Sequence, residues 1–124
     1  MLSLTVENLY NDRLFWEKLI MNNAEYHQIV EQTWQQIEEE LEQQDCDVDC
    51  DTQGSVFTIT FDDGSQIVVN KQEPLQELWL ASKLGGYHFR YQDGQWLNAE
   101  GKNFWHYLSE ACAAYGEQVE FSNQ

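Results

Sequence analysis

The hydrophobic pattern of the chain changes from helical spacing to strand-like alternation and then back again. From residue 23, apolar positions recur every three or four residues and form one face, while the opposite face is polar. Either Asn22 or Asn23 can cap the start of this segment. The apolar face of the predicted first helix consists of Tyr26, Ile29, Val30, Thr33, Trp34, Ile37 and Leu41.

The middle of the chain follows the period of two that is typical of strands. The clearest run, 56–61, alternates β-branched or aromatic residues with threonine, and Asp63-Gly64 supplies a tight turn after it. A second turn is expected at Gly85-Gly86. The predicted strands are 45–51, 56–61, 66–70, 78–81, 87–91 and 96–98.

The chain ends with a second predicted helix, followed by a tail at 119–121 that we expect to lie along the domain. The apolar face of this helix comprises Phe104, Leu108, Ala111, Cys112 and Tyr115. A helix, about six strands and a helix predict an α+β fold, with both helices packed on one face of an antiparallel sheet. The length of 124 residues fits one domain, which we assign to 21–124. We interpret residues 1–20 as an N-terminal extension or a segment added for expression.

The charge balance limits the partners of this protein. The chain has 22 acidic residues against 6 Lys and Arg, a net charge of -16, which excludes nucleic acid and anionic membranes as favourable partners. Cations and basic protein surfaces remain as favourable partners. The sequence contains no bilayer-length apolar run and no signal or transit peptide pattern, so we expect a cytoplasmic protein.

The most unusual stretch is 45–51, where aspartates alternate with Cys46, Val48 and Cys50. In a strand, these carboxylates would lie roughly 7 Å apart on one face, and oxygen ligands of this kind suit hard cations. An EF-hand is excluded because Cys50 stands where the loop needs Gly and Val56 where it needs Glu. Cys46 and Cys50 are too far apart along a strand to share one zinc ion, and we expect both to be buried, inert thiols.

The polar face of the first helix continues this acidity, since no Lys or Arg occurs between Lys18 and Lys71. Like charges four residues apart destabilise a helix slightly, and here they are left unpaired. We call the predicted metal-binding set the acidic ridge; the alternative is an ordinary solvated surface. His27 could join it, although a lone helical His is more often a surface residue. The acidic ridge comprises Glu38, Glu39, Glu42, Asp45, Asp47, Asp49 and Asp51.

A second candidate surface lies in the amide- and aromatic-rich stretch 70–89. Asn70, Gln72 and Trp79 are expected on the solvent face of the sheet, where an exposed Trp between amides is a common docking anchor. The alternative interpretation of this stretch is that its side chains pack in the core. No nucleophile motif, P-loop or dinucleotide fingerprint is present, and nothing marks a nucleophile beside His88 or His106. We therefore predict no catalytic residue.

These same residues carry a resemblance to the frataxin family, in particular its bacterial CyaY branch. The segment from Asn70-Lys71-Gln72-Glu73-Pro74 through Trp79 to Gly85-Gly86-Tyr87-His88-Phe89 resembles the family signature, and the resemblance extends from Met21 almost to the end. The family usually has Gln two residues before the signature Trp, where this chain has Glu77. The resemblance implies an α-β sandwich with both helices on one side of the sheet.

The resemblance also implies a function. Members bind iron (Fe²⁺ or Fe³⁺) weakly on the acidic ridge, where other divalent or trivalent cations can substitute, and they act in iron–sulfur cluster assembly. Bacterial members bind and regulate the cysteine desulfurase, here through Glu38, Glu39, Glu42 and Asp45. The face with Asn70, Gln72 and Trp79 would contact the iron–sulfur scaffold protein. We expect a non-enzymatic monomer that iron can drive into oligomers; the alternatives are ferroxidase or iron-storage activity, or an acidic adaptor with incidental metal binding.

Overall fold

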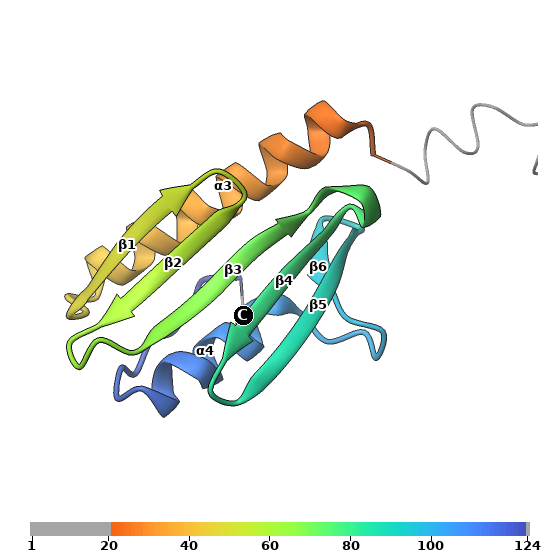
Figure 1. Cartoon of the computed structure of the whole chain (residues 1–124). Helices are drawn as coiled ribbons and strands as arrows, with labels where there is room; N and C mark the ends of the chain where they lie inside the picture. Colours follow the sequence, from red (N-terminus) through yellow and green to blue (C-terminus); the bar gives the residue numbers. More distant parts are fainter. Residues whose placement is uncertain (1–20, 124) are drawn as a thin grey trace, which may run out of the picture.

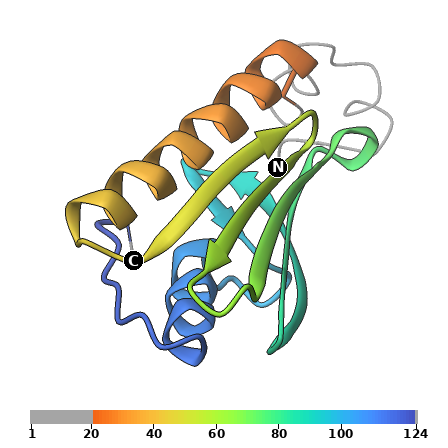
Figure 2. The same ribbon diagram turned by 60° about the vertical axis from the view of Figure 1, so that its left-hand side comes forward.

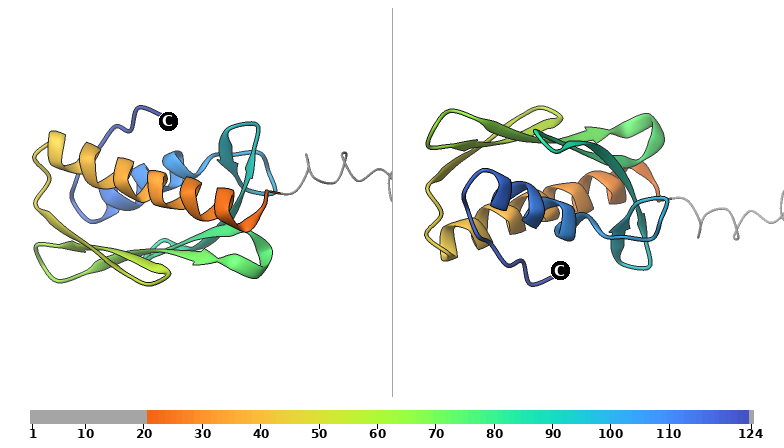
Figure 3. Two further views of the ribbon diagram at one scale, coloured as in Figure 1. Left: turned by 90° about the horizontal axis from the view of Figure 1, so that it is seen from above. Right: turned by 90° about the horizontal axis from the view of Figure 1, so that it is seen from below.

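The computed structural model describes residues 21–123, so the interpretation of residues 1–20 lies outside the described part of the chain. Two layers are present: a six-stranded antiparallel sheet, and two helices that cover one of its faces (Figures 1 and 3). This confirms the predicted α+β sandwich. The elements are α3 (Asn23–Gln43), β1 (Val48–Gln53), β2 (Val56–Phe61), β3 (Gln66–Gln72), the 3₁₀ turn η1 (Glu73–Leu75), β4 (Glu77–Ser82), β5 (Gly85–Gln92), β6 (Gln95–Leu97) and α4 (Phe104–Ala114).

The sheet is a continuous meander in which every strand pairs with its neighbours in sequence, in the order β1 to β6. Such short antiparallel connections need only tight turns. Successive residues of a strand point to opposite faces of the sheet, and in β2 the face toward the helices carries the buried Phe57, Ile59 and Phe61. Because the helices cover only one face, the outer face of β3 and β4 is open to solvent.

The core lies between the two layers. Trp34 of α3 stacks on Phe57 at 5.7 Å between ring centroids, and Phe89 of β5 meets Phe104 of α4 edge-on at 5.5 Å. The predicted helical faces are confirmed, with Ile29 half-buried and the other members on α3 buried. Neither helix among residues 21–123 is long and apolar enough to cross a membrane.

The end of α3 corrects the prediction of a strand over 45–51. Asp45 takes a left-handed conformation with φ of 54°. Its N–H donates to the Glu42 carbonyl at 3.1 Å, and the N–H of Cys46 donates to the Leu41 carbonyl at 3.1 Å. This pair of bonds is a Schellman motif, which satisfies the last helix carbonyls and reverses the chain. The strand therefore begins only at Val48.

Two smaller predictions are also wrong. Gly85 and Gly86 begin β5 rather than forming the turn, which falls on Lys83 and Leu84. Cys46 and Cys50 are half-buried rather than buried. Cys50 is on the edge strand β1, of which only the inner side touches the core, and Cys46 lies in the turn that precedes this strand.

The last residues, 117–123, run back across α3 as an extended segment that we call the C-terminal strap (Figure 2). Gln44 makes two bonds to the backbone of Glu120, donating from Nε2 to its carbonyl at 3.0 Å and accepting its N–H at 3.1 Å. Ser122 donates its N–H to the Glu40 carboxylate at 2.8 Å. Val119 and Phe121 are buried beneath. The prediction that the tail lies along the domain is confirmed.

Candidate functional site

An acidic hollow lies between the end of α3 and the start of β1. Its apolar and sulfur-containing lining residues are Leu41, Cys46, Val48 and Cys50. Five predicted ridge acids surround it, and we call this feature the acidic groove. Its acids are Glu38, Glu42, Asp45, Asp47 and Asp49.

The local fold explains why these acids meet. Glu38 and Glu42 lie one turn apart on α3, so their side chains share one helix face. The Schellman motif then turns the chain back, which brings the residues that follow Asp45 alongside that face. Acids separated by as many as eleven positions in the chain thus border one hollow.

The groove is strongly electronegative. Among residues 21–123, none of its five carboxylates forms an ion pair with a basic side chain. The last turn of α3 also contains no basic residue, so the negative end of the helix dipole is not offset. Glu117 of the C-terminal strap adds another carboxylate, which accepts the N–H of Asp47 at 3.2 Å.

The two groove thiols are protonated at neutral pH. Burial raises the pKa of Cys50 to about 12, and the charges of Glu38 and Asp49 add to this effect. Burial also raises the pKa of Cys46, assisted by Glu117 and Asp45. Because metal ligation and nucleophilic attack need the thiolate, ligation by either thiol would require the loss of its proton, which ligation by the carboxylate oxygens does not.

Other predicted ridge residues lie apart from the groove. Glu39 is on the neighbouring face of α3, where it accepts a hydrogen bond from Gln35 at 3.0 Å. Asp51 follows Asp49 along β1 and is not one of the residues that line the groove. They can add to the electric field of the groove but do not line it.

The structure places His27 apart from the acidic groove. His27 is near the start of α3, roughly 24 Å from the helix end that borders the groove. Its Nε2 is 3.1 Å from a carboxylate oxygen of Glu73, and its Nδ1 is 3.1 Å from Nζ of Lys71. It therefore connects α3 to the end of β3.

No group of three or more His, Cys, Asp or Glu side chains in the described region is arranged as a ready metal cage. A cation in the acidic groove would have to draw carboxylates together and keep part of its water shell. Such a site is open and weakly selective, in contrast to a closed set of ligands.

The second predicted surface is on the outer face of the sheet, as expected. Asn70 of β3 lies directly opposite Trp79 of β4, and Gln72 follows on the same side of β3. Trp79 is 38% exposed, while the two amides are half-buried.

Sequence reasoning missed the polar cluster that supports this tryptophan. Glu77 is buried, and its carboxylate receives Nε1 of Trp79 at 2.9 Å and Nε of Arg90 at 3.3 Å. Nδ1 of His88 lies 3.4 Å from the same carboxylate. The cluster depends on the pairing of β4 with β5, which a single sequence does not reveal.

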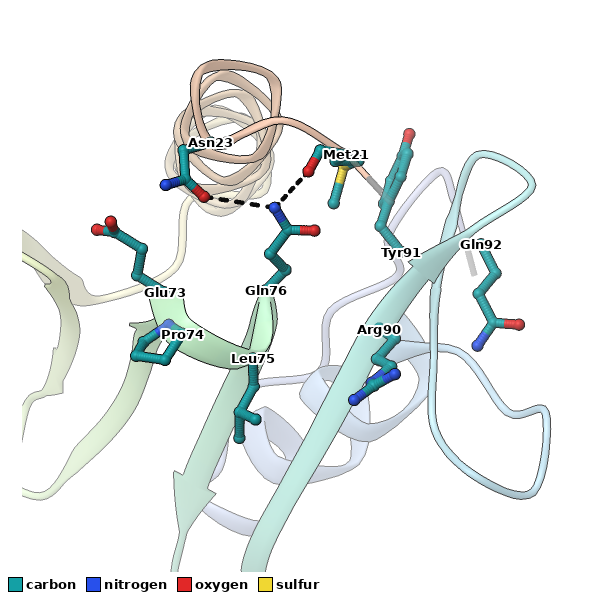
Figure 4. Close-up of a pocket in the computed structure, with 9 residues that line it drawn as sticks. All are labelled: Met21, Asn23, Glu73, Pro74, Leu75, Gln76, Arg90, Tyr91 and Gln92. Atoms are coloured by element: carbon teal, nitrogen blue, oxygen red, sulfur yellow. Dashed lines mark hydrogen bonds between the residues drawn. The ribbon is translucent and has the colours of Figure 1, made fainter. Parts of the chain in front are cut away.

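A further hollow was also missed, at the end of the molecule where α3 begins (Figure 4). There the Gln76 side chain donates to the carbonyl of Met21, next to Asn23. Arg90 and Glu73 contribute one charge of each sign. The left-handed Gln76 that shapes this hollow follows Pro74, which was the only local signal in the sequence.

Comparison with known proteins agrees with this fold. The model of the frataxin-like domain matches residues 19–118. The iron-sulfur cluster assembly protein CyaY of Histophilus somni (strain 2336) is 71% identical over 102 residues, which cover 82% of this chain and 100% of that protein. The structure of frataxin from Psychromonas ingrahamii has a TM-score of 0.76 at 36% identity, covering 82% of this chain and 99% of that chain.

A trimeric yeast frataxin from Saccharomyces cerevisiae, complexed with ferrous iron, shares the fold with a TM-score of 0.59 at 24% identity, covering 89% of this chain and 96% of that chain. The expected family is confirmed by the match to the domain model and by the relative that this chain spans completely. The chain therefore belongs to the frataxin family.

Proposed function

We propose that this protein acts in iron–sulfur cluster assembly as a non-enzymatic, iron-binding regulator. The observation that carries the proposal is the acidic groove: five acidic residues line one hollow at the negative end of a helix, and their carboxylates have no basic partner in the described chain. The name of the relative from Histophilus somni, an iron-sulfur cluster assembly protein, supports the same role. We place this activity in the cytoplasm, in line with three free thiols.

Iron is the proposed cargo of the acidic groove. Carboxylate oxygens suit a hard cation, and an open arrangement lets the ion keep water ligands and leave again. Binding is therefore weak, and other divalent or trivalent cations compete for the same oxygens. Glu39 and Asp51 contribute through their charge rather than as direct ligands in this proposal.

The cysteine desulfurase is the proposed protein partner of the same acids. A basic surface would be drawn to the groove by long-range attraction, and the interaction would weaken as salt increases. The outer face with Asn70, Gln72 and Trp79 is left free for the iron–sulfur scaffold protein, because it lies on the opposite side of the sheet from the helices.

Two variants of equal charge test this proposal. The groove variant carries Glu38→Gln, Glu42→Gln and Asp49→Asn. The control variant carries Glu31→Gln, Asp62→Asn and Glu100→Gln, which change the net charge equally at exposed positions away from the groove. Both are titrated with Fe²⁺ under anaerobic conditions and followed by NMR, and then with purified desulfurase by calorimetry.

We expect the groove variant to lose at least tenfold in affinity for both iron and desulfurase, while the control variant remains close to the unmodified protein. Equal losses in both variants would show that only net charge matters and would overturn the assignment to the groove. Fe²⁺ oxidation that is faster than in buffer, and slowed in the groove variant, would instead establish the ferroxidase alternative.

A further inference from the structure

The acidic groove borders the free edge of the sheet. In residues 21–123, β1 pairs with β2 on one side and with no strand on the other. An unpaired strand edge offers backbone donors and acceptors to any extended segment of suitable sequence. The edge therefore has a binding capacity that is separate from its carboxylates.

The register identifies which backbone groups are free. Phe61 of β2 donates its N–H to Ser65, on the side of β3. In an antiparallel ladder, alternate residues point to opposite neighbours, so Thr60 and Thr58 point toward β1. Their partners are Asp49 and Asp51, which accordingly use their backbone groups within the sheet.

It follows that the intervening residues of β1 direct their N–H and C=O groups away from the sheet. These are Val48, Cys50 and Thr52. The N–H of Val48 is already bound to the carbonyl of Cys46 at 3.0 Å. The open donors of the edge are thus the N–H groups of Cys50 and Thr52.

Carboxylates lie on both sides of this edge. Glu38 and Glu42 stand on the helix side, above the inward-facing Val48 and Cys50. Asp49 and Asp51 project from the opposite face of β1, since side chains of a strand alternate. A strand added at the edge would place its side chains alternately toward these two groups of acids.

We propose that the edge of β1 binds an extended segment rich in Lys and Arg by strand addition. This deepens the proposed function and rests on it, since it specifies how a basic partner such as the desulfurase engages the groove. Adjacent basic residues of the segment reach Glu38 and Glu42 on one side and Asp49 and Asp51 on the other. A second copy of this chain is a poor occupant, because its own edge carries the same charges and the net charge is -16.

The test uses a peptide and a pair of variants. The probe peptide repeats Lys-Arg-Val. Its control repeats Lys-Arg-Pro, which has the same charge, but every third residue lacks a backbone N–H and the prolines interrupt strand pairing. Thr52→Pro removes one outward N–H without removing a bond to β2, whereas Thr52→Val keeps that N–H. Thermal melting confirms that both variants are folded before affinity for the peptides is measured.

We expect Thr52→Pro to weaken binding of the Lys-Arg-Val peptide about fivefold to tenfold, while Thr52→Val has no effect. The Lys-Arg-Pro peptide should bind the unmodified protein about as weakly as the Lys-Arg-Val peptide binds the Thr52→Pro variant. Equal binding of the two peptides, equal binding by the two variants or no peptide binding would overturn strand addition. If desulfurase still depends on the groove acids in that case, the proposed function stands without this inference.

Hydrogen exchange gives a second measurement that does not depend on a substitution. On addition of the Lys-Arg-Val peptide to the unmodified protein, the amide protons of Cys50 and Thr52 should become protected at least tenfold. Docking through charge alone would leave both exchanging as before, and this outcome would also overturn the inference.

Discussion

Trp79 donates a hydrogen bond of 2.9 Å from Nε1 to the carboxylate of Glu77, two residues before it on β4. The Glu77 side chain is only 8% exposed, although it lies on the solvent face of the sheet, because Trp79, His88 and Arg90 surround it. Burial acts to raise the pKa of this carboxyl, but the bonds from Trp79 and Arg90 outweigh burial and lower it. A charged carboxylate therefore fixes the orientation of the exposed tryptophan.

We expect Glu77→Gln to destabilise the fold by about 1–3 kcal/mol at pH 7, since the amide nitrogen cannot accept from Arg90 and the charge is lost. A lowered folded-state pKa means that the carboxylate contributes stability above its unfolded pKa of about 4.3, and loses it as pH falls through the folded value. The difference between the variant and the unmodified protein should thus shrink between about pH 5 and pH 3, as measured by urea unfolding.

Arg90→Gln provides the control for this pair. If the Arg90 contact causes the loss, the double variant should be more stable than the sum of the two single effects predicts. Additive effects would mean that Glu77 acts mainly through Trp79. The NMR signal of the Trp79 indole N–H in the single variants would then report the disorder at position 79.

The sequence pattern was sufficient to predict the layers of this fold, because burial on one side imposes a period of about 3.6 on helices and of two on strands. It failed at Asp45 for a physical reason. The alternation of acid and apolar residues runs unbroken across the helix end, whereas the Schellman bonds to Glu42 and Leu41 depend on backbone geometry. Pattern alone cannot distinguish a left-handed turn residue from a strand residue of the same polarity.

The site residues also differ in whether the sequence alone could group them. The grouping of Glu38 and Glu42 could be predicted from helix spacing. The cluster of Glu77 with Arg90 could not be, since it needs the register that places these residues opposite each other on β4 and β5. His27 was grouped with the acids because it shares their helix, but the length of α3 places it far from them.

Two buried tryptophans provide a matched pair for the energy of an indole hydrogen bond. Trp96 donates from Nε1 to Thr33 Oγ1 at 3.0 Å, while the buried Nε1 of Trp34 has no acceptor among the described residues. Trp96→Phe should cost about 1 kcal/mol more in unfolding free energy than Trp34→Phe, because only the first substitution removes a bond that was made. Chemical unfolding of the two variants measures the difference; equal losses would contradict it.

The left-handed conformation of Asp45 provides a stabilising substitution. At this position after a helix, Gly avoids the steric cost that a side chain brings. We expect Asp45→Gly to raise the unfolding free energy by about 0.5–1 kcal/mol. Asp45→Asn is the matched control, since it removes the same charge but keeps a side chain; an equal gain in both variants would assign the effect to charge relief.

The C-terminal strap should depend on Glu40. Its carboxylate receives the N–H and the hydroxyl of Ser122, at 2.8 Å and 3.1 Å, and Nε2 of Gln36 at 2.7 Å. Glu40→Ala should lower the unfolding free energy by about 1 kcal/mol and speed digestion of the tail by carboxypeptidase. Glu39→Ala removes an exposed neighbour whose carboxylate accepts a hydrogen bond from Gln35, and it should change stability by less than about 0.5 kcal/mol.

Alkaline pH should expose the contribution of Cys112, which is fully buried on α4. Burial raises the pKa of its thiol to about 12, compared with an ordinary value of 9.0. The unfolded chain therefore releases this proton at lower pH than the folded chain does. The stability that the protonated Cys112 thiol contributes is fully present below about pH 9. It is lost as pH rises toward 12, by about 1.4 kcal/mol per pH unit for this one group.

Cys112→Ala should make this alkaline loss less steep, at the expense of a small cavity that lowers stability at every pH. Part of the slope should remain, because burial also raises the pKa of Tyr26 and that of Cys50 to about 12. Urea unfolding between pH 7 and pH 11 measures the slope. Cys46→Ala is the comparison, since burial raises the pKa of this half-buried thiol less than that of Cys112, and its removal should change the slope less. An unchanged slope in Cys112→Ala would mean that the folded protein opens locally and releases this proton before it unfolds.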